Sequence, residues 1–160
     1  MQKIVTNLWF DTQAEEAAKF YISLFEDGDI HNITYYGPSG AKVSGMPEGT
    51  VLTVEFSLAD QEYIAINGGP MFKFTPAISL MVNCDTQEEI DRLWEAFCEE
   101  GQPEECGWLT DKYGLSWQIV PRKLNELLSN PDPEKVENVN RALFSMKKLD
   151  IEQLRKAALE

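Results

Sequence analysis

The chain has 160 residues and carries 14 Lys and Arg against 27 Asp and Glu, a formal charge of -13 at pH 7. Phosphate backbones and anionic bilayers repel so acidic a chain, so we expect neither nucleic acid nor a membrane as a partner. At 43% hydrophobic residues, the chain can bury the core of one compact unit or of two small fused modules. It shows no signal-peptide pattern and no apolar run near the roughly 20 residues of a membrane span, so we expect a cytoplasmic protein.

The first elements are an apolar run, NLWF, and a helical pattern that meets it at the triplet DTQ. Asp11 and Glu15 are expected to supply an N-cap oxygen and a first-turn carboxylate. The segment IHNITYYG is typical of a strand, and VLTVEFSLADQEYIAING predicts two alternating strands across a tight turn at Asp60. Three-and-four spacing of apolar residues predicts the amphipathic helix, at Ala17, Phe20, Tyr21, Leu24 and Phe25.

The same triplet opens a second helical pattern, in MVNCDTQEEIDRLWEAF, where Asp85 and Glu88 take the expected capping roles. Downstream, ECGWLTDKYGLSWQIVP has the shape of the earlier hairpin, with its turn near Asp111. One offset of 51 residues (118 − 67) aligns the two hairpins. The aligned pairs are Leu58 with Leu109, Asp60 with Asp111, and Asn67 with Gln118. The sequence therefore predicts two tandem strand-helix-strand-strand-strand modules.

The remaining segments are a connector and a helical tail. NGGPMFKFTP is short and carries two aromatic residues, so we interpret it as a fixed connector and not as a flexible linker. After Pro121, RKLNELL, PEKVENVNRALFSMKKL and IEQLRKAAL predict three helices, the last with Asp150 as its N-cap. We expect residues 1–69 and 70–121 to be the two modules and residues 122–160 the helical tail, within one structural domain.

Three blocks of the chain resemble a known family: LWFDTQAEEAAKFYISLF, INGGPMFKFTPAISLMVNCDTQEEIDRLWEAF and CGWLTDKYGLSWQIVP. They are similar to the PhnB-like branch, labelled 3-demethylubiquinone-9 3-methyltransferase, of the vicinal-oxygen-chelate (VOC) superfamily of glyoxalases, bleomycin-resistance proteins and dioxygenases. The resemblance covers nearly the whole chain. It implies an α+β fold of two tandem βαβββ modules that form a cupped mixed sheet, with a C-terminal helical appendage. It also implies a small-molecule cavity on the concave face and a homodimer.

Strand alternation separates two faces of the predicted sheets. One face is apolar and should pack on the helices, with Leu8, Phe10, Leu52, Val54, Phe56, Leu58, Ile64, Ile66, Ile78, Leu80, Val82, Leu115, Trp117 and Ile119. The opposite face is small or polar, which in a generic sheet indicates solvation; the resemblance implies an enclosed face. Candidate ligand-binding residues on it are Asn7, Trp9, Asn67, Ser79, Ser116 and Gln118. We add Trp108, at the pocket rim or at a dimer seam.

The superfamily's metal ligands, carried over by position, fall near Val5, Asn67 or Ala65, Ala77 and Gln118. None of these residues is the imidazole, thiolate or carboxylate that transition metals prefer, so we expect no metal and no cofactor. The single histidine, His31, is expected to be a surface residue. Three cysteines without CxxC spacing predict reduced thiols, and Cys106 is expected to be packed or exposed and not reactive.

Three hypotheses of function remain. The first is metal-free binding of an aromatic or polar small molecule. The second is a lyase, isomerase or dioxygenase that uses an unrecognised metal or Glu55, which could act as a general base if a cavity shields it. The third is a structural dimer whose pocket has filled. The methyltransferase label has no support in the sequence, because GGP follows a strand of a hairpin instead of opening a helix after a parallel strand.

Overall fold

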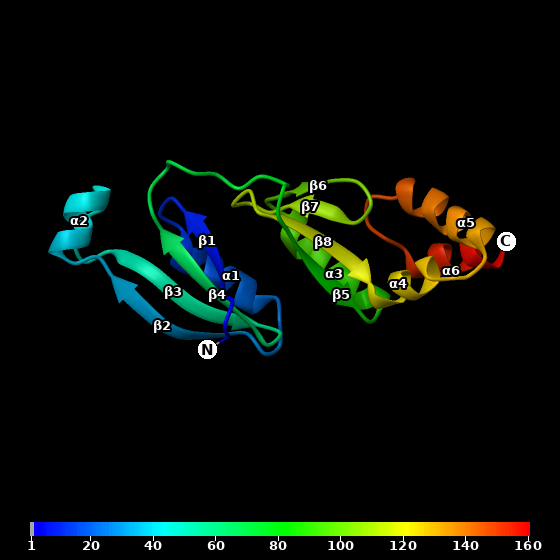
Figure 1. Ribbon diagram of the computed structural model, residues 1–160, viewed down its shortest axis with the longest axis horizontal. Coiled ribbons are helices and arrows are strands. Elements are labelled where there is room, and N and C mark those ends of the chain that lie inside the picture. The colour runs from blue at the N-terminus through cyan, green and yellow to red at the C-terminus, as the bar shows by residue number, and fades with distance from the viewer. Residues whose placement is uncertain (1) are drawn as a thin grey trace. The chain divides into compact units, whose positions relative to one another are not determined.

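The computed structural model describes residues 2–160. The chain divides into two compact units, Met1–Phe74 and Thr75–Glu160. Each unit holds one four-stranded mixed sheet (Figure 1). The hydrogen-bond ladders of the described strands form one sheet in each unit, as two tandem βαβββ modules require.

The first unit has the predicted strand-helix-strand-strand-strand order with one added helix. Its elements are β1 (Thr6–Phe10), α1 (Ala14–Ser23), β2 (Asp29–Tyr35), α2 (Pro38–Ser44), β3 (Val51–Leu58) and β4 (Gln61–Asn67). The sheet order is β1-β4-β3-β2, with β1 parallel to β4 and the other neighbours antiparallel. Ala59 and Asp60 form the predicted tight turn, with φ of 47° and 67°, as a two-residue type I′ hairpin turn requires.

Helix α1 covers one face of the first sheet. Its residues Ala14, Ala17 and Ala18 are fully buried, and the ring of Tyr21 stacks on that of Phe56 with centroids 6.4 Å apart. Short alanine side chains let a helix backbone approach a sheet closely. The added helix α2 has no buried residue and stands away from the sheet (Figure 1). We call the sheet face opposite α1 the helix-free face of the first unit.

The second unit repeats the order and adds the helical tail. Its sheet elements and their helix are β5 (Ser79–Cys84), α3 (Gln87–Cys98), β6 (Gln102–Pro103), β7 (Trp108–Thr110) and β8 (Ser116–Pro121). The sheet order is β5-β8-β7-β6, with β5 parallel to β8. Helix α3 buries Ile90, Leu93 and Phe97, and the Phe97 ring lies 4.7 Å from that of Trp117. We call the opposite face the helix-free face of the second unit.

The three C-terminal helices are present as predicted. They are α4 (Arg122–Leu128), α5 (Pro133–Phe144) and α6 (Ile151–Leu159), and they share a small core with Val120 of β8. Helix α5 ends earlier than the pattern predicts, and beyond its end the carbonyls of Met146 and Lys147 accept hydrogen bonds from the Cys106 and Gly107 amides, each at 2.8 Å. Asp150 caps α6 as expected, accepting from the Gln153 amide at 3.0 Å.

The two DTQ corners are strand-to-helix corners, but their capping differs from the prediction. Asp11 does not cap α1, which begins at Ala14 after Gln13 without a side-chain cap from its own segment. The Ala14 amide instead donates to Oδ1 of Asn67, the last residue of β4, at 2.8 Å. The N-terminal cap of α1 therefore comes from a residue of β4 and not from the DTQ triplet that precedes the helix.

At the second corner the cap is shifted by one residue. The hydroxyl of Thr86, and not Asp85, accepts from the Glu89 amide at 3.1 Å. The Glu89 carboxylate in turn accepts from the Asp85 amide at 2.9 Å. This reciprocal pair is a variant of the capping box, which a shift of one residue in the helix start makes possible.

The predicted alternation is wrong for β4, and Ile78, which was expected to pack on a helix, precedes β5 and is 69% exposed. Ala65 and Asn67, with exposed fractions of 0% and 5%, lie on the α1 side, whereas Ile64 and Ile66 are half-buried on the helix-free face. Register fixes this assignment, because Ala65 pairs with the fully buried Val54. In β1, Leu8 and Phe10 face α1 as predicted. None of the helices in residues 2–160 is long and apolar enough to cross a bilayer.

Candidate functional site

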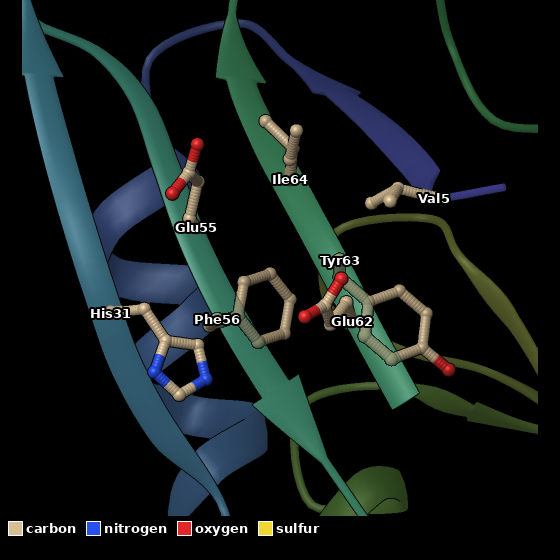
Figure 2. Close-up of a pocket in the computed structure, with 7 residues that line it drawn as sticks. All are labelled: Val5, His31, Glu55, Phe56, Glu62, Tyr63 and Ile64. Atoms are coloured by element: carbon tan, nitrogen blue, oxygen red, sulfur yellow. The ribbon is translucent and has the colours of Figure 1, made fainter. Parts of the chain in front are cut away.

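The helix-free face of the first unit contains a pocket of about 210 Å³. Figure 2 shows its lining side chains, which come from β2, β3, β4 and the segment just before β1. They are Val5, His31, Glu55, Phe56, Glu62, Tyr63 and Ile64. At about 30 Å³ for each water, the volume corresponds to roughly seven water molecules, and so to a small organic molecule.

Strand pairing places the polar and apolar parts of the pocket side by side. Glu55 of β3 is the register partner of Ile64 of β4. His31 lies in β2 at a register irregularity, and its Nε2 is 2.9 Å from the Ser57 hydroxyl. The Glu62 carboxylate accepts from the backbone amide of Gln2 at 2.6 Å. The pocket thus offers two carboxylates and an imidazole beside an aliphatic wall.

The aromatic part of the pocket belongs to its base. The rings of Phe56 and Tyr63 stack with centroids 5.4 Å apart, and Phe56 is only 1% exposed because it reaches into the α1 side. Burial raises the pKa of the Tyr63 phenol above its ordinary value. These two rings support the pocket more than they contact its occupant.

The predicted site residues of the first unit are distributed over both sheet faces. Glu55, the candidate base, lies in the pocket. Trp9 is half-buried, its indole N–H donates to the Gly69 carbonyl at 3.0 Å, and its ring contacts Phe72. Asn7 is exposed and its amide bonds the nearby Val5 carbonyl.

Asn67 lies on the opposite side, away from the pocket. Its Oδ1 accepts from the Ala14 amide, and its Nδ2 donates to the Val51 carbonyl at 3.1 Å. Both ends of this carboxamide are committed to the fold. Sequence reasoning placed it on the ligand face because the strand was assigned the wrong alternation.

The predicted residues of the second unit lie together on its helix-free face. Ser79 is the register partner of Ser116, and Gln118 is the partner of both Met81 and Trp108. The Gln118 amide donates to the Ser79 hydroxyl at 2.9 Å. The structure therefore gathers a carboxamide, two hydroxyls and an indole on adjacent strands.

The hydroxyl of Ser116 is an exception to the usual pairing of buried polar groups. Its residue is 1% exposed, and Oγ has no hydrogen-bond partner among the described residues. A buried hydroxyl without a partner carries an unrecovered desolvation cost. It is therefore a hydrogen-bonding group that a bound water or ligand atom could satisfy.

The metal site of the superfamily does not fit the residues present. At the four corresponding positions Val5 and Ala77 carry no ligand atom, and the Asn67 carboxamide is already used on both ends. Gln118 offers only a neutral amide, which binds to Ser79. Within residues 2–160, no three His, Cys, Asp or Glu side chains are grouped as a metal site would require.

The three thiols are free and their environments disfavour the thiolate. Burial raises the pKa of Cys84 to about 12, with smaller contributions from the nearby Glu89 and Asp85 carboxylates. Burial likewise raises the pKa of Cys98 and of Cys106, and Glu105 adds to the effect at Cys106. A nucleophilic cysteine needs a lowered pKa, so this chemistry is disfavoured at all three.

Comparison with known proteins supports the fold and the family. Residues 2–120 match the model of the family described as 3-demethylubiquinone-9 3-methyltransferase. The chain belongs to this family. A solved PhnB protein from Bacillus cereus, described as a putative 3-demethylubiquinone-9 3-methyltransferase, is 40% identical with a TM-score of 0.67, over 75% of this chain and 99% of that one.

Two further structures are more distant. Protein PA1353 from Pseudomonas aeruginosa is 20% identical with a TM-score of 0.61, over 76% of this chain and 98% of that one, and shows the fold alone. A lactoylglutathione lyase from Agrobacterium tumefaciens is 18% identical with a TM-score of 0.38, over 78% of this chain and 96% of that one. No curated protein matches this PhnB-like chain significantly. It has the α+β VOC fold with a C-terminal helical appendage.

The methyltransferase description of the family is not reflected in the sheet topology. Each sheet of this PhnB-like protein has one parallel pair at one edge and antiparallel pairs elsewhere. Gly68 and Gly69 follow β4 and lead into the connector, not into a helix. Among residues 2–160, none of the parallel strands leads into a helix through a glycine turn, which is the element that cradles the cofactor in doubly wound methyltransferases.

Proposed function

We propose that this PhnB-like protein binds a small organic molecule on the helix-free face of its sheets, without the metal ion of the superfamily's metalloenzymes. The observation that carries the proposal is the pocket of about 210 Å³ on the first sheet. It combines an aliphatic wall with a few convergent polar groups, the usual composition of a small-molecule site.

The second sheet supports the same proposal. Trp108 offers an aromatic surface beside Gln118, and no described residue forms a hydrogen bond with the Ser116 hydroxyl. Side chains of this kind recognise planar polar molecules, because an indole face packs on the ring while amide and hydroxyl groups fix its orientation. Substituting Gln118→Ala is expected to weaken binding of a ligand that uses this face.

A fragment screen monitored by amide chemical shifts of the full chain tests the proposal. Bound fragments should shift the amides of Val5, Glu55 and Ile64, and an Ile64→Trp variant, which fills the pocket, should abolish these shifts. Val43→Trp is the matched control, since Val43 is 89% exposed on α2 and away from the pocket. A screen in which no fragment perturbs the pocket amides would refute the proposed site.

An enzyme is the second candidate function, because the Glu55 carboxylate faces any occupant of the pocket. A carboxylate beside an apolar wall is suited to remove a proton from a carbon or oxygen acid. If a reaction is catalysed there, Glu55→Gln should abolish turnover while the ligand still binds. Turnover that survives this substitution would exclude Glu55 as the base.

We further propose a homodimer that acts in a reducing compartment such as the cytoplasm. The free state of Cys84, Cys98 and Cys106 supports the compartment, and the family resemblance supports the dimer. Light scattering after size exclusion should give twice the mass of 18.2 kDa. A single chain mass would contradict the dimer.

A further inference from the structure

The lining of the pocket in the first unit is negatively charged. Two of its seven lining residues are carboxylates, Glu55 and Glu62, and none is Lys or Arg. Neither carboxylate forms an ion pair with a described residue. Among residues 2–160, the pocket is therefore a concave surface with negative charge and no Lys or Arg in its lining.

The two carboxylates differ in how much of their hydrogen-bonding capacity is used. One oxygen of Glu62 accepts from the Gln2 amide, which fixes this side chain at the pocket edge. No hydrogen bond from a described residue reaches the carboxylate of Glu55, which stands beside Ile64 on the neighbouring strand. A half-buried carboxylate with open acceptor sites favours a charged donor over a neutral one.

The remaining polar group does not reverse this preference. His31 has one ring nitrogen 2.9 Å from the Ser57 hydroxyl, so it contributes at most one further hydrogen-bonding position to the pocket. An anionic ligand would meet two carboxylates with no counter-charge, a strongly unfavourable arrangement in a partly desolvated site. The aliphatic wall of Val5 and Ile64 suits a small apolar body.

We propose that the pocket takes an organic cation, a primary or secondary ammonium group attached to a small apolar body. The ammonium group lies between Glu55 and Glu62, and the apolar body lies against Ile64 and Val5. This inference rests on the proposed function and names the class of its ligand. The volume of about 210 Å³ admits a molecule of the size of benzylamine.

Three molecules of nearly equal shape test the charge preference: benzylamine, benzyl alcohol and benzoate, titrated at 150 mM salt into the full chain with amide shifts as readout. We expect benzylamine to bind about tenfold more tightly than benzyl alcohol, because charge-assisted hydrogen bonds are about twice as strong as neutral ones. Benzoate should not shift the pocket amides. Glu55→Gln with Glu62→Gln should reduce benzylamine affinity to that of the alcohol.

The controls separate a specific site from the general attraction of an acidic protein for cations. Glu26→Gln removes one charge from an exposed position of the same unit and should leave benzylamine affinity unchanged. An equal loss in Glu26→Gln and Glu55→Gln would overturn the inference, since the attraction would then be non-specific. Ile64→Trp should abolish binding by filling the pocket.

The remaining outcomes distinguish the inference from the function on which it rests. Equal binding of benzyl alcohol, or tighter binding of benzoate, at the pocket amides would overturn the cation preference and leave the proposed function standing. If none of the three molecules and no fragment of the wider screen shifts the pocket amides, the proposed function and the cation preference are both refuted. Pocket ligands from the screen that are all neutral or anionic would overturn the cation class alone.

Discussion

The backbone amide of Ala14 and the carboxamide oxygen of Asn67 are joined by a buried hydrogen bond of 2.8 Å that spans 53 positions of the chain. It ties the first turn of α1 to the last residue of β4. The same carboxamide donates to the Val51 carbonyl of β3, so one side chain links three elements. The Tyr36 hydroxyl also donates to the Asn67 backbone carbonyl, which adds the end of β2 to this junction.

Removing this carboxamide should destabilise the first unit. Asn67→Ala leaves the buried Ala14 N–H and Val51 carbonyl without partners, and we expect the free energy of unfolding to fall by about 2–3 kcal/mol. Urea denaturation followed by circular dichroism measures this change. Asn7→Ala is the control, since its exposed local bond should be worth no more than about 0.5 kcal/mol. Equal stability of the two variants would contradict the capping role.

The second unit depends on a buried aspartate at its hairpin. Asp111 is 3% exposed, and its carboxylate accepts from the Tyr113 and Leu115 amides and from the Trp117 indole at 2.8, 3.0 and 2.9 Å. In Asp111→Asn the NH₂ group must face one of these donors, so the unfolding free energy should fall by about 2 kcal/mol.

The corresponding turn of the first unit supplies the control for this prediction. Asp60 has a φ of 67°, which Asn adopts more readily than most residues, so Asp60→Asn should leave stability unchanged or slightly raised. Both variants lose one negative charge at a hairpin turn. A similar loss of stability in both variants would indicate a charge effect. It would contradict the explanation that the new NH₂ group at position 111 faces another donor, such as the Trp117 indole N–H.

The stability of the protein should decrease at high pH in a way that depends on Cys84. The pKa of this thiol is raised to about 12 in the folded chain, against 9.0 for an ordinary cysteine. Between these values the unfolded chain releases the proton and the folded chain retains it, so stability is complete below pH 9 and decreases as pH rises toward 12. The slope from this group reaches about 1.4 kcal/mol per pH unit.

Urea denaturation of wild type and Cys84→Ala at several pH values from 8 to 11, with a reductant present, measures this contribution. Other groups titrate in the same pH range. Their contribution is common to both proteins, so it cancels when the pH dependence of the unfolding free energy is compared between wild type and Cys84→Ala. The Cys84→Ala protein should lose less stability per pH unit than wild type, whatever its stability at pH 8. Parallel slopes would show that this thiol has an ordinary pKa in the folded chain.

Trp9 is held in place by a glycine. A Cβ atom added at Gly68 would lie 2.2 Å from the Trp9 ring, so Gly68→Ala must displace the indole and break its bond to the Gly69 carbonyl. We expect a shifted indole N–H resonance and a stability loss of about 1–3 kcal/mol. In Gly37→Ala the added atom meets nothing within 4 Å, and the Trp9 resonance should not move. An unmoved resonance in Gly68→Ala would contradict the observed packing.

One available signal could have corrected the alternation of β4. If the predicted tight turn at Asp60 is taken as a two-residue turn of Ala59 and Asp60, it pairs Ser57 with Glu62, which is the register in the structure. Register partners point to the same face, so Glu62 and Ile64 belong with Ser57 and Glu55 on the helix-free side. Relative size misled the prediction, because Ile64 and Ile66 are larger than Ala65 and were expected to be in the core.

The repeat alignment contains the same error. The parallel ladders pair Phe10 with Asn67 and Cys84 with Pro121, so the equivalent of Asn67 is Pro121, 54 residues later, and not Gln118, 51 residues later. A difference of three residues reverses the face, because side chains alternate with a period of two. For this reason Gln118 lies on its helix-free face whereas Asn67 caps a helix.

Periodicity and turn chemistry act over a few neighbouring residues, so the sequence predicted every described helix except α2, together with the order of the strands, the repeat and the tight turn at Asp60. The atom that caps α1 and the residues that line the pocket could be assigned only from the folded chain. These depend on strand register, which in the first sheet joins residues 57 positions apart (66 − 9), such as Trp9 and Ile66. A pattern along the chain does not contain such distances, since a shift of one residue preserves every local preference and exchanges the two faces of the sheet.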